Sequence, residues 1–466
     1  MKKSQIVSQV EVVDIANDGK AVARVEGKVI FISGALPGDV ADIQITKSKK
    51  DWAEARTIQI TKKSEHRVDA FCKHFGECGG CKWQDLNYET QLFYKHKTAV
   101  EAIRRIGKTE PKEIFHIIGC TEEKYYRNKL EFTFSNKKWW TKKELQTRND
   151  AAESANALGF HVMFLFDKIV DVEHCWMQSS PSNEIRIAVK KFCDENNFSF
   201  FDLRAQVGLM RNLIIRTTST GETMVIVCFH ENDKEKILML MNFLKEKFPE
   251  ITSLNFVINE KRNDTIFDLP VINFSGNEII VEQLEDFKFR ISPKSFFQTN
   301  TLQALNLYRV VRDFAGLTGK ELVYDLYTGT GSIALFVSKL AKKIIGIEQV
   351  EAAIEDAKLN AELNKIEHVE FFAGDMKDAL SDKFINELGM PDVVITDPPR
   401  AGMHEDVVKK LFNMAPQKIV YVSCNPATQA RDILLLTEKY EVVKMQPVDM
   451  FPHTHHIENV LLLERK

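Results

Sequence analysis

A cysteine at position 424 stands where a hydrophobic run gives way to a turn. The run QKIVYV (417–422) continues through Ser423 and Cys424 into Asn-Pro, within the stretch YVSCNPATQARD (421–432). A cysteine that only fills the core lies inside such a run. One at its end, followed by a proline that starts a helix, projects from the sheet. We therefore expect the Cys424 thiol to face a cleft above a sheet edge.

A second candidate site is the glycine loop in VYDLYTGTGSIALF (323–336), which combines a strand, a turn and a helix start. Gly329 and Gly331 allow a tight turn and the close approach of a ligand, and Ala334 permits close packing of helix on strand. The spacing satisfies the G-x-G-x-x-G/A fingerprint of dinucleotide sites. Glu348 ends the next strand, where an acid can bind both hydroxyls of a ribose. The motif alone fits a nicotinamide cofactor and S-adenosylmethionine equally.

Acidic residues at further strand ends favour S-adenosylmethionine. Asp325 precedes the glycines, where a carboxylate would repel a pyrophosphate but attract the cationic amino-acid end of S-adenosylmethionine. Asp375 ends the third strand, in FFAGD, where it can meet an adenine or its surroundings. A nicotinamide-dependent oxidoreductase with a catalytic cysteine stays open as an alternative from another class.

The string TDPPR (396–400) ends the fourth strand. The carboxyl ends of strands in an open α/β sheet line its ligand crevice, so Asp397 and Cys424 are expected in one cleft. A thiol beside a methyl donor indicates nucleophilic catalysis, in which sulfur activates an acceptor carbon that is otherwise too weak. Pyrimidine C5 is such a carbon. Addition of sulfur to C6 makes C5 enolate-like, and a base must later remove the C5 proton so that the thiol can leave.

Three of the eight cysteines cluster in FCKHFGECGGCKW (71–83). Cys72, Cys78 and Cys81 have C-x5-C-x2-C spacing, and Cys175 in DVEHCWMQ is the best candidate for a fourth ligand. Four thiolates hold either tetrahedral zinc or an iron–sulfur cluster, and the spacing leaves the two about equal. The cysteines expected in the core are Cys120, Cys193 and Cys228.

The predicted elements fall into three domains. Residues 1–65 alternate in short strands with glycine turns, which predicts a small OB-type barrel, a fold often used for RNA. Residues 66–285 mix strands and helices as an α+β domain, with an irregular excursion at 136–156. Residues 286–466 alternate strands and helices, which predicts a doubly wound, Rossmann-like α/β domain with a parallel sheet. Its last two apolar runs have no helix between them and predict a closing antiparallel hairpin.

Composition sets broader limits. The 466 residues allow two to four domains, and the net charge of −3 argues neither for nor against nucleic acid. Basic residues mix with aromatics at 47–56, 95–108 and 137–143, a mixture that binds phosphates and stacks on bases, although each segment alone fits a solvated face. The chain has no apolar run long enough to span a membrane and begins without a signal peptide. These features predict a cytoplasmic protein with reduced thiols.

Five short strings follow one another along the chain: SFFQTN, DLYTGTGS, DPPRAG, SCNPATQARD and HIENV. They resemble the motifs of bacterial RNA uracil-5-methyltransferases of the ribosomal-RNA type, in order and at compatible spacing. The resemblance covers essentially the whole chain, since the first barrel resembles a TRAM domain. It implies that Cys424 is the nucleophile and that Glu458, in HIENV, is the base that takes the C5 proton. The residues it assigns to S-adenosylmethionine are Gln298, Tyr327 and Glu348, with Asp397 between cofactor and uracil.

The same resemblance narrows the remaining choices. Pro398 and Pro399 follow Asp397 where RNA cytosine-5-methyltransferases carry a cysteine, which favours uracil over cytosine. The resemblance also favours a 4Fe–4S cluster with a structural role in the cysteine loop. In YYRNKLEF (125–132), Arg127 and Lys129 are expected to contact phosphate. The neighbouring histidines, expected to shape the acceptor pocket rather than bind metal, are His453, His455 and His456.

The predicted substrate is a uridine of 23S ribosomal RNA. Transfer-RNA enzymes of this kind often lack both the cluster loop and the barrel, but transfer RNA stays the alternative. An RNA-binding protein with a decayed methyltransferase domain is less favoured, because Cys424, Glu458 and Asp397 are all present. The protein is expected to be a monomer. The stretch around Trp139 and Trp140 (136–150) departs from the family pattern and is interpreted as an insertion of unexplained role.

Overall fold

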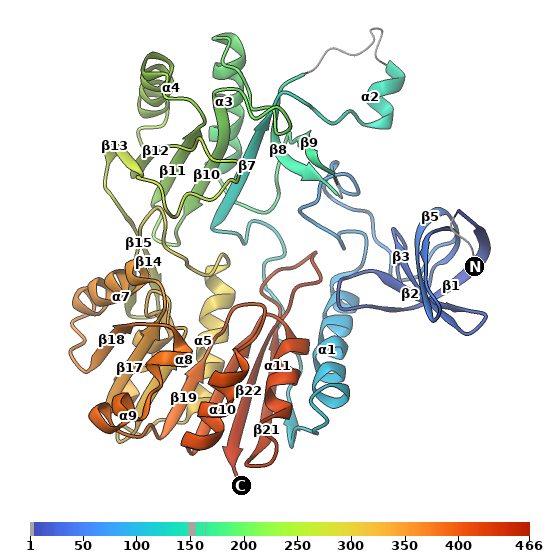
Figure 1. Ribbon diagram of the computed structural model, residues 1–466. Coiled ribbons are helices and arrows are strands. Elements are labelled where there is room, and N and C mark those ends of the chain that lie inside the picture. Colours follow the sequence, from blue (N-terminus) through green and yellow to red (C-terminus); the bar gives the residue numbers. More distant parts are fainter. Residues whose placement is uncertain (1–3, 148–154, 164) are drawn as a thin grey trace.

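A closed barrel and three sheets organise the chain (Figure 1). The computed structural model describes residues 4–147, 155–163 and 165–466. Within these ranges, no helix has both the length and the apolar character needed to cross a bilayer.

The amino-terminal barrel has the five strands that the sequence predicts, in the order β1-β2-β3-β5-β4. Alternate residues such as Ala23, Ile30 and Ile43 point inward and are fully buried, as the period of two requires. In Figure 1 the barrel stands to one side of the large sheets. Its strands are β1 (Ile6–Ile15), β2 (Ala21–Val25), β3 (Lys28–Ser33), β4 (Val40–Ser48) and β5 (Trp52–Lys62).

The central sheet has the order β13-β12-β11-β10-β7-β8-β9. Two helices, α3 (Ser182–Glu195) and α4 (Lys234–Lys247), pack together, and the rings of Phe192 and Phe243 stack at 4.2 Å. The strands are β7 (Lys129–Ser135), β8 (Ala157–Val162), β9 (Leu165–Asp171), β10 (Met210–Thr217), β11 (Thr223–Phe229), β12 (Ser253–Ile258) and β13 (Ile272–Gly276).

The interpreted insertion lies between β7 and β8. It contains the short helix α2 (Lys142–Thr147), and its residues 148–154 lie outside the described ranges. The ammonium of Lys138 lies 4.5 Å from the centre of the Trp140 ring and also pairs with Glu144 at 2.8 Å.

The carboxyl-terminal sheet has the order β18-β17-β16-β19-β20-β22-β21-β6. Its first five strands are parallel, and β22 and β21 form the predicted antiparallel hairpin. The strand order of the sheet reverses between β16 and β19, which is where open α/β sheets bind ligands. The strands are β6 (Glu113–Ile114), β16 (Leu322–Leu326), β17 (Lys343–Glu348), β18 (Val369–Ala373), β19 (Val393–Thr396), β20 (Lys418–Ser423), β21 (Tyr440–Val448) and β22 (Glu458–Arg465).

Helices cover both faces of this sheet, as the alternating pattern predicts (Figure 1). Residues 376–388, whose spacing predicts one helix, form two short helices, because the Ser381 side chain accepts a hydrogen bond from the Phe384 N–H and starts a new helix. The helices are α5 (Thr301–Ala315), α6 (Ser332–Val337), α7 (Glu351–Leu363), α8 (Met376–Ala379), α9 (Asp382–Leu388), α10 (Glu405–Met414) and α11 (Pro426–Leu434), with the 3-10 turn η1 (Ser338–Leu340) after α6.

The segment 66–285 contributes to more than the central sheet. Helix α1 (Tyr88–Arg105) packs against α11, and strand β6 pairs with β21 at the edge of the carboxyl-terminal sheet. A separate hairpin, β14 (Ile280–Leu284) and β15 (Phe287–Ile291), joins the two large sheets. The early part of the chain therefore helps to build the carboxyl-terminal α/β unit, which the sequence pattern does not indicate.

Candidate active site

Adjacent strands bring the predicted site residues together. Asp325 lies near the end of β16, Asp397 follows β19, and the Asp397 N–H donates to the Leu326 carbonyl at 3.3 Å. Cys424 follows β20, and Asn425 then caps α11 with Pro426 in its first turn. Cys424 therefore lies between a strand and a helix, and it is not among the residues that line the large cavity described next.

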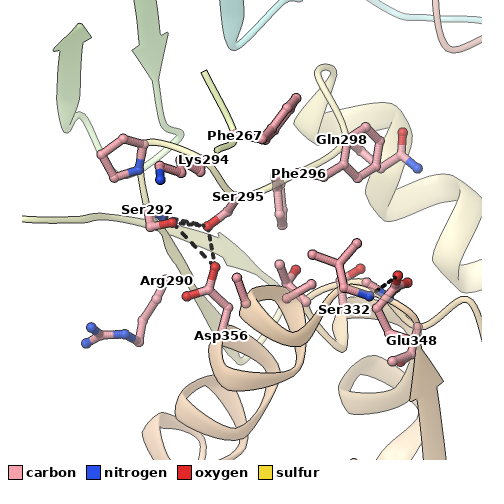
Figure 2. Close-up of a pocket in the computed structure, with 18 of the residues that line it drawn as sticks. Phe267, Arg290, Ser292, Lys294, Ser295, Phe296, Gln298, Ser332, Glu348 and Asp356 are labelled. Atoms are coloured by element: carbon pink, nitrogen blue, oxygen red, sulfur yellow. Dashed lines mark hydrogen bonds between the residues drawn. The ribbon is translucent and has the colours of Figure 1, made fainter. Parts of the chain in front are cut away.

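A cavity of about 1240 Å³ opens at the reversal point of the sheet. Figure 2 shows Gln298 and Phe296 on one side of it and Ser332 and Glu348 on the other. The connection between β12 and β13 also contributes to its lining, through residues that include Phe267. The predicted residues that line it are Gln298, Asp325, Tyr327, Gly329, Glu348 and Asp397.

The glycine turn is fixed by Glu348. The two carboxylate oxygens of Glu348 accept hydrogen bonds from the N–H groups of Gly329, at 3.2 Å, and Val350, at 3.0 Å. Gly331 has a φ of 77°, and a Cβ there would lie 2.7 Å from the Phe371 ring. Only glycine fits both the left-handed backbone and the close contact at this position.

Two carboxyls, the buried one of Asp325 and the half-buried one of Asp397, give the cavity its chemical character. Burial raises the pKa of Asp325 to about 7, although the Thr328 hydroxyl donates to that carboxylate at 2.5 Å. Burial, followed by the charge of Asp325, also raises the pKa of Asp397 to about 7. A ligand that carries positive charge would return both groups to their ionised form, so the cavity favours a cation over an anionic pyrophosphate.

Cys424 and Glu458 lie at the ends of neighbouring antiparallel strands. The last pair of the β20–β22 ladder is Ser423 with Asn459, so the register sets Cys424 opposite Glu458. Glu458 is only 6% exposed, and burial together with Asp397 raises its pKa well above the usual value. Burial, Glu458 and Asp397 raise the pKa of the Cys424 thiol to about 11. A buried carboxyl and a half-buried thiol therefore face each other beside the cavity.

Alkylation of Cys424 should report this environment. We expect iodoacetamide to react slowly at pH 7 and about tenfold faster for each pH unit up to about 11, because only the thiolate is nucleophilic. Mass spectrometry of the peptide that contains Cys424 measures the rate. A rate that levels off below about pH 9 would show an ordinary thiol and contradict the prediction.

Asp375 lies outside the cavity lining. Its side chain caps α8 by accepting the Lys377 N–H at 3.1 Å, and its carboxylate lies 3.6 Å from the Lys377 ammonium. Conversely, Ser332 lines the cavity without having been predicted, and its hydroxyl bonds that of Tyr308 at 2.8 Å. In the sequence, Ser332 is an ordinary residue after the glycine turn, so no signal identified it.

The three histidines precede Glu458 in the chain. The rings of His455 and His456 lie 4.2 Å apart, and burial lowers the pKa of His455 to about 3 and of His456 to about 4. His453 is buried, with its Nε2 3.7 Å from the Glu123 carboxylate. These rings are held neutral near the Cys424–Glu458 pair.

The four predicted metal ligands gather around a second cavity, of about 170 Å³. Burial raises the pKa of Cys78 to about 12 and of Cys81 to about 11, and the negative charges of the neighbouring cysteine thiolates raise both pKa values further. Across the described parts of the chain, no three His, Cys, Asp or Glu side chains are spaced to hold a metal ion directly. The cysteines that line the cavity are Cys72, Cys78, Cys81 and Cys175.

The remaining predictions from the sequence can be located as well. Cys193 and Cys228 are buried in the core, whereas Cys120 is only half-buried. Arg127 lines the cysteine cavity and stacks over Phe451, with its guanidinium carbon 5.0 Å from the ring centre. Lys129 lies 4.0 Å from Glu131 and is largely buried.

Comparison with known families matches two parts of the chain. Residues 202–466 match the model described as tRNA (Uracil-5-)-methyltransferase, and residues 7–58 match the TRAM domain. The second match coincides with the five-stranded barrel.

Individual relatives span the full length. A protein of Bacteroides thetaiotaomicron described as an uncharacterized RNA methyltransferase is 55% identical over 454 residues, covering 97% of this chain and 100% of its own. One of Porphyromonas gingivalis with the same description is 52% identical over 461 residues, covering 98% and 99%. Among solved structures, the tRNA (uracil-54, C5)-methyltransferase of Pyrococcus abyssi, in complex with S-adenosyl-L-homocysteine, is 29% identical with a TM-score of 0.75, covering 98% of this chain and 100% of its own.

Proposed function

This chain is an RNA methyltransferase that belongs to the tRNA (uracil-5-)-methyltransferase family, and we propose that it converts a uridine of 23S ribosomal RNA to 5-methyluridine with S-adenosylmethionine. The observation that carries the proposal is the placement of Cys424 opposite Glu458, beside a cavity that the carboxyls of Asp325 and Asp397 line. A thiol and a base are the two groups that C5 methylation of a pyrimidine requires.

The cavity residues fit S-adenosylmethionine. Glu348 is placed for the ribose hydroxyls, Asp325 for the ammonium group, and Gln298 and Tyr327 complete the wall. When bound, the cofactor supplies a methyl group on a positively charged sulfur, which the acidic lining of this cavity favours. The solved relative from Pyrococcus abyssi, whose structure contains the demethylated product S-adenosyl-L-homocysteine, supports this assignment.

In the proposed first step, Cys424 attacks the uracil ring. The thiol loses its proton to water, and the thiolate Sγ forms a bond to C6. The electron pair of the C5–C6 double bond moves onto C5 and the O4 carbonyl, so that C5 becomes the nucleophile for the methyl group. Asp397, which lines the cavity, would read the uracil edge, because at a pKa of about 7 it can either donate or accept.

In the proposed second step, Glu458 restores the ring. Its carboxylate takes the C5 proton, the C–H electron pair re-forms the C5–C6 double bond, and Cys424 leaves from C6 as a thiolate. Glu458 is suited to this role because burial raises its pKa and makes its carboxylate a stronger base. The prolines after Asp397 leave no second cysteine there, which supports uracil over cytosine.

Ribosomal RNA is the proposed substrate because the motif strings resemble the ribosomal-RNA enzymes and the chain has both the barrel and the cysteine loop. Transfer RNA is the second candidate, and the relative from Pyrococcus abyssi, a transfer-RNA enzyme that aligns with 98% of this chain, favours it. In either case the protein would act on RNA as a monomer in the cytoplasm.

The test is incubation with labelled S-adenosylmethionine and either 23S ribosomal RNA or transfer-RNA transcripts, followed by digestion and nucleoside analysis. We expect labelled 5-methyluridine from ribosomal RNA. Product from transfer RNA only would move the substrate to the second candidate. Label on another nucleoside, or on none, would overturn the proposal.

We also propose that the four cysteines hold a 4Fe–4S cluster with a structural role. Four thiolates are the ligand set of such a cluster. The four thiols line one cavity of about 170 Å³, which leaves room for a group larger than a single ion.

Metal analysis of protein purified without oxygen checks this assignment. We expect about four iron and four sulfide per chain, as for a cubane held by four thiolates. Cys175→Ser should remove most of the iron, while Cys193→Ser, a change in the core of the same domain, should retain it. About one zinc per chain and no sulfide would contradict the cluster.

A further inference from the structure

The segment from Asp449 to Ile457 connects β21 to the proposed base, Glu458. It has no regular secondary structure, and His453 within it has a left-handed backbone, with a φ of 64°. Such a conformation in a residue with a Cβ persists only when its surroundings impose it. The contacts of this segment therefore determine where β22, and with it Glu458, begins.

A buried ion pair holds the start of the segment. The Lys95 ammonium of α1 lies 2.6 Å from the Asp449 carboxylate, and both side chains are fully buried. Lys95 also donates to the Phe451 carbonyl at 3.0 Å, and the Tyr88 hydroxyl donates to Asp449 at 2.9 Å. Removal of either partner of a buried pair leaves an uncompensated charge in the core, so the pair ties Asp449 to α1.

Gln91 of α1 holds the middle of the segment. Its side-chain oxygen accepts the His453 N–H at 2.8 Å, and its side-chain nitrogen donates to the carbonyls of Trp83, at 2.9 Å, and Leu86, at 2.8 Å. Gln91 is fully buried. One amide thus joins the Glu458 segment to the chain that leaves the cysteine loop.

Backbone bonds reinforce that junction. The His453 carbonyl accepts hydrogen bonds from the N–H groups of Lys82, at 2.8 Å, and Trp83, at 3.0 Å, directly after Cys81. The barrel touches the same place, because a Cβ on Gly19 would lie 2.9 Å from the His455 Cβ. Helix α1, the cysteine loop and the barrel therefore all meet at the segment that ends in Glu458.

We propose that Gln91 is a positioning residue for Glu458, acting through the His453 backbone. The inference rests on the proposed function, in which Glu458 takes the C5 proton after methyl transfer. Loss of the Gln91 bonds frees the left-handed His453 and shifts the start of β22. Because β20 also pairs with β19 on its other side, Cys424 at the end of β20 should keep its place, and the variant should still add to uracil and methylate it. Only proton removal, and hence release of the RNA, should become slow.

The test is Gln91→Met, which keeps the side-chain length and removes these three hydrogen bonds together with the 3.3 Å contact between the Gln91 amide nitrogen and the His453 Nδ1. We expect kcat to fall roughly 10- to 100-fold, the effect of a base misplaced by about 1 Å, with KM for RNA nearly unchanged. The diagnostic readout is a covalent protein–RNA adduct that carries the labelled methyl group and survives denaturing electrophoresis. It should accumulate roughly tenfold above wild type. A change that merely destabilised the fold would lower all steps together and leave no adduct.

Two further variants complete the experiment. Asn259→Leu removes an equally buried amide with comparable backbone bonds in the central domain, and should give no adduct. If Gln91→Met fails to fold, Tyr126→Phe, which removes a 3.0 Å bond to the Pro452 carbonyl in the same segment, should show a smaller rise in adduct.

The outcomes separate this inference from the proposed function. If wild type forms no 5-methyluridine, the proposed function fails. The positioning role alone is tested when wild type is active and Glu458→Gln accumulates the methylated adduct. In that case the role is overturned if Gln91→Met accumulates no adduct, whether its kcat is normal or reduced.

Discussion

Cys424→Ala is expected to abolish formation of 5-methyluridine, with a loss of at least about 10⁴-fold, the scale seen when a catalytic nucleophile is removed. C5 of uracil is a poor nucleophile until sulfur adds at C6, and the register of β20 against β22 leaves Cys424 as the thiol opposite Glu458. Labelled methyl transfer to RNA under single-turnover conditions measures the loss.

The same variant should bind S-adenosylmethionine almost as well as wild type. The side chains proposed to contact the cofactor include Gln298, Tyr327 and Glu348, which line the large cavity, whereas Cys424 is not among its lining residues. Cys193→Ala, in the core of the central domain, is the matched control and should keep its activity. Residual methylation within about tenfold of wild type would show that the chemistry does not proceed through Cys424.

The sequence predicted much of the fold because its signals are local. Each parallel strand of the carboxyl-terminal sheet shows as an apolar run, and Asp325, Asp397 and Cys424 stand at the ends of such runs. Parallel strands bring their carboxyl ends to one edge, so the common location of these residues follows from topology alone. The five-stranded barrel could likewise be predicted, from the alternation of apolar and polar residues and from the glycine turns between its strands.

Other features depend on contacts between distant parts of the chain. Glu458 opens an apolar strand and appears ordinary until the β20–β22 register sets it opposite Cys424, so residue spacing alone could not identify it. Asp375 also follows a strand, but its side chain turns to cap α8 instead of facing the cavity. Helix α1 and strand β6 join the carboxyl-terminal sheet from far upstream, and nothing in their local patterns specifies that partner.

Glu458→Gln is expected to separate methyl transfer from product release. The amide that replaces the carboxylate cannot take the C5 proton, so the methylated uracil should stay bonded to Cys424 and turnover should fall about 10²- to 10⁴-fold, the usual contribution of a general base. Denaturing electrophoresis with labelled S-adenosylmethionine should show close to one labelled RNA adduct per enzyme. Wild type should release its product and show little adduct.

The pH dependence of wild-type release provides a further check on the same residue. Burial and Asp397 raise the pKa of Glu458, and only the carboxylate can act as the base, so release should be slow at low pH and accelerate as pH rises through that raised pKa. In Glu458→Gln this acceleration should disappear while adduct formation persists. A variant that releases 5-methyluridine with the wild-type pH profile would show that another group removes the proton. Asp397, which influences both Cys424 and Glu458, would then be the next residue to replace.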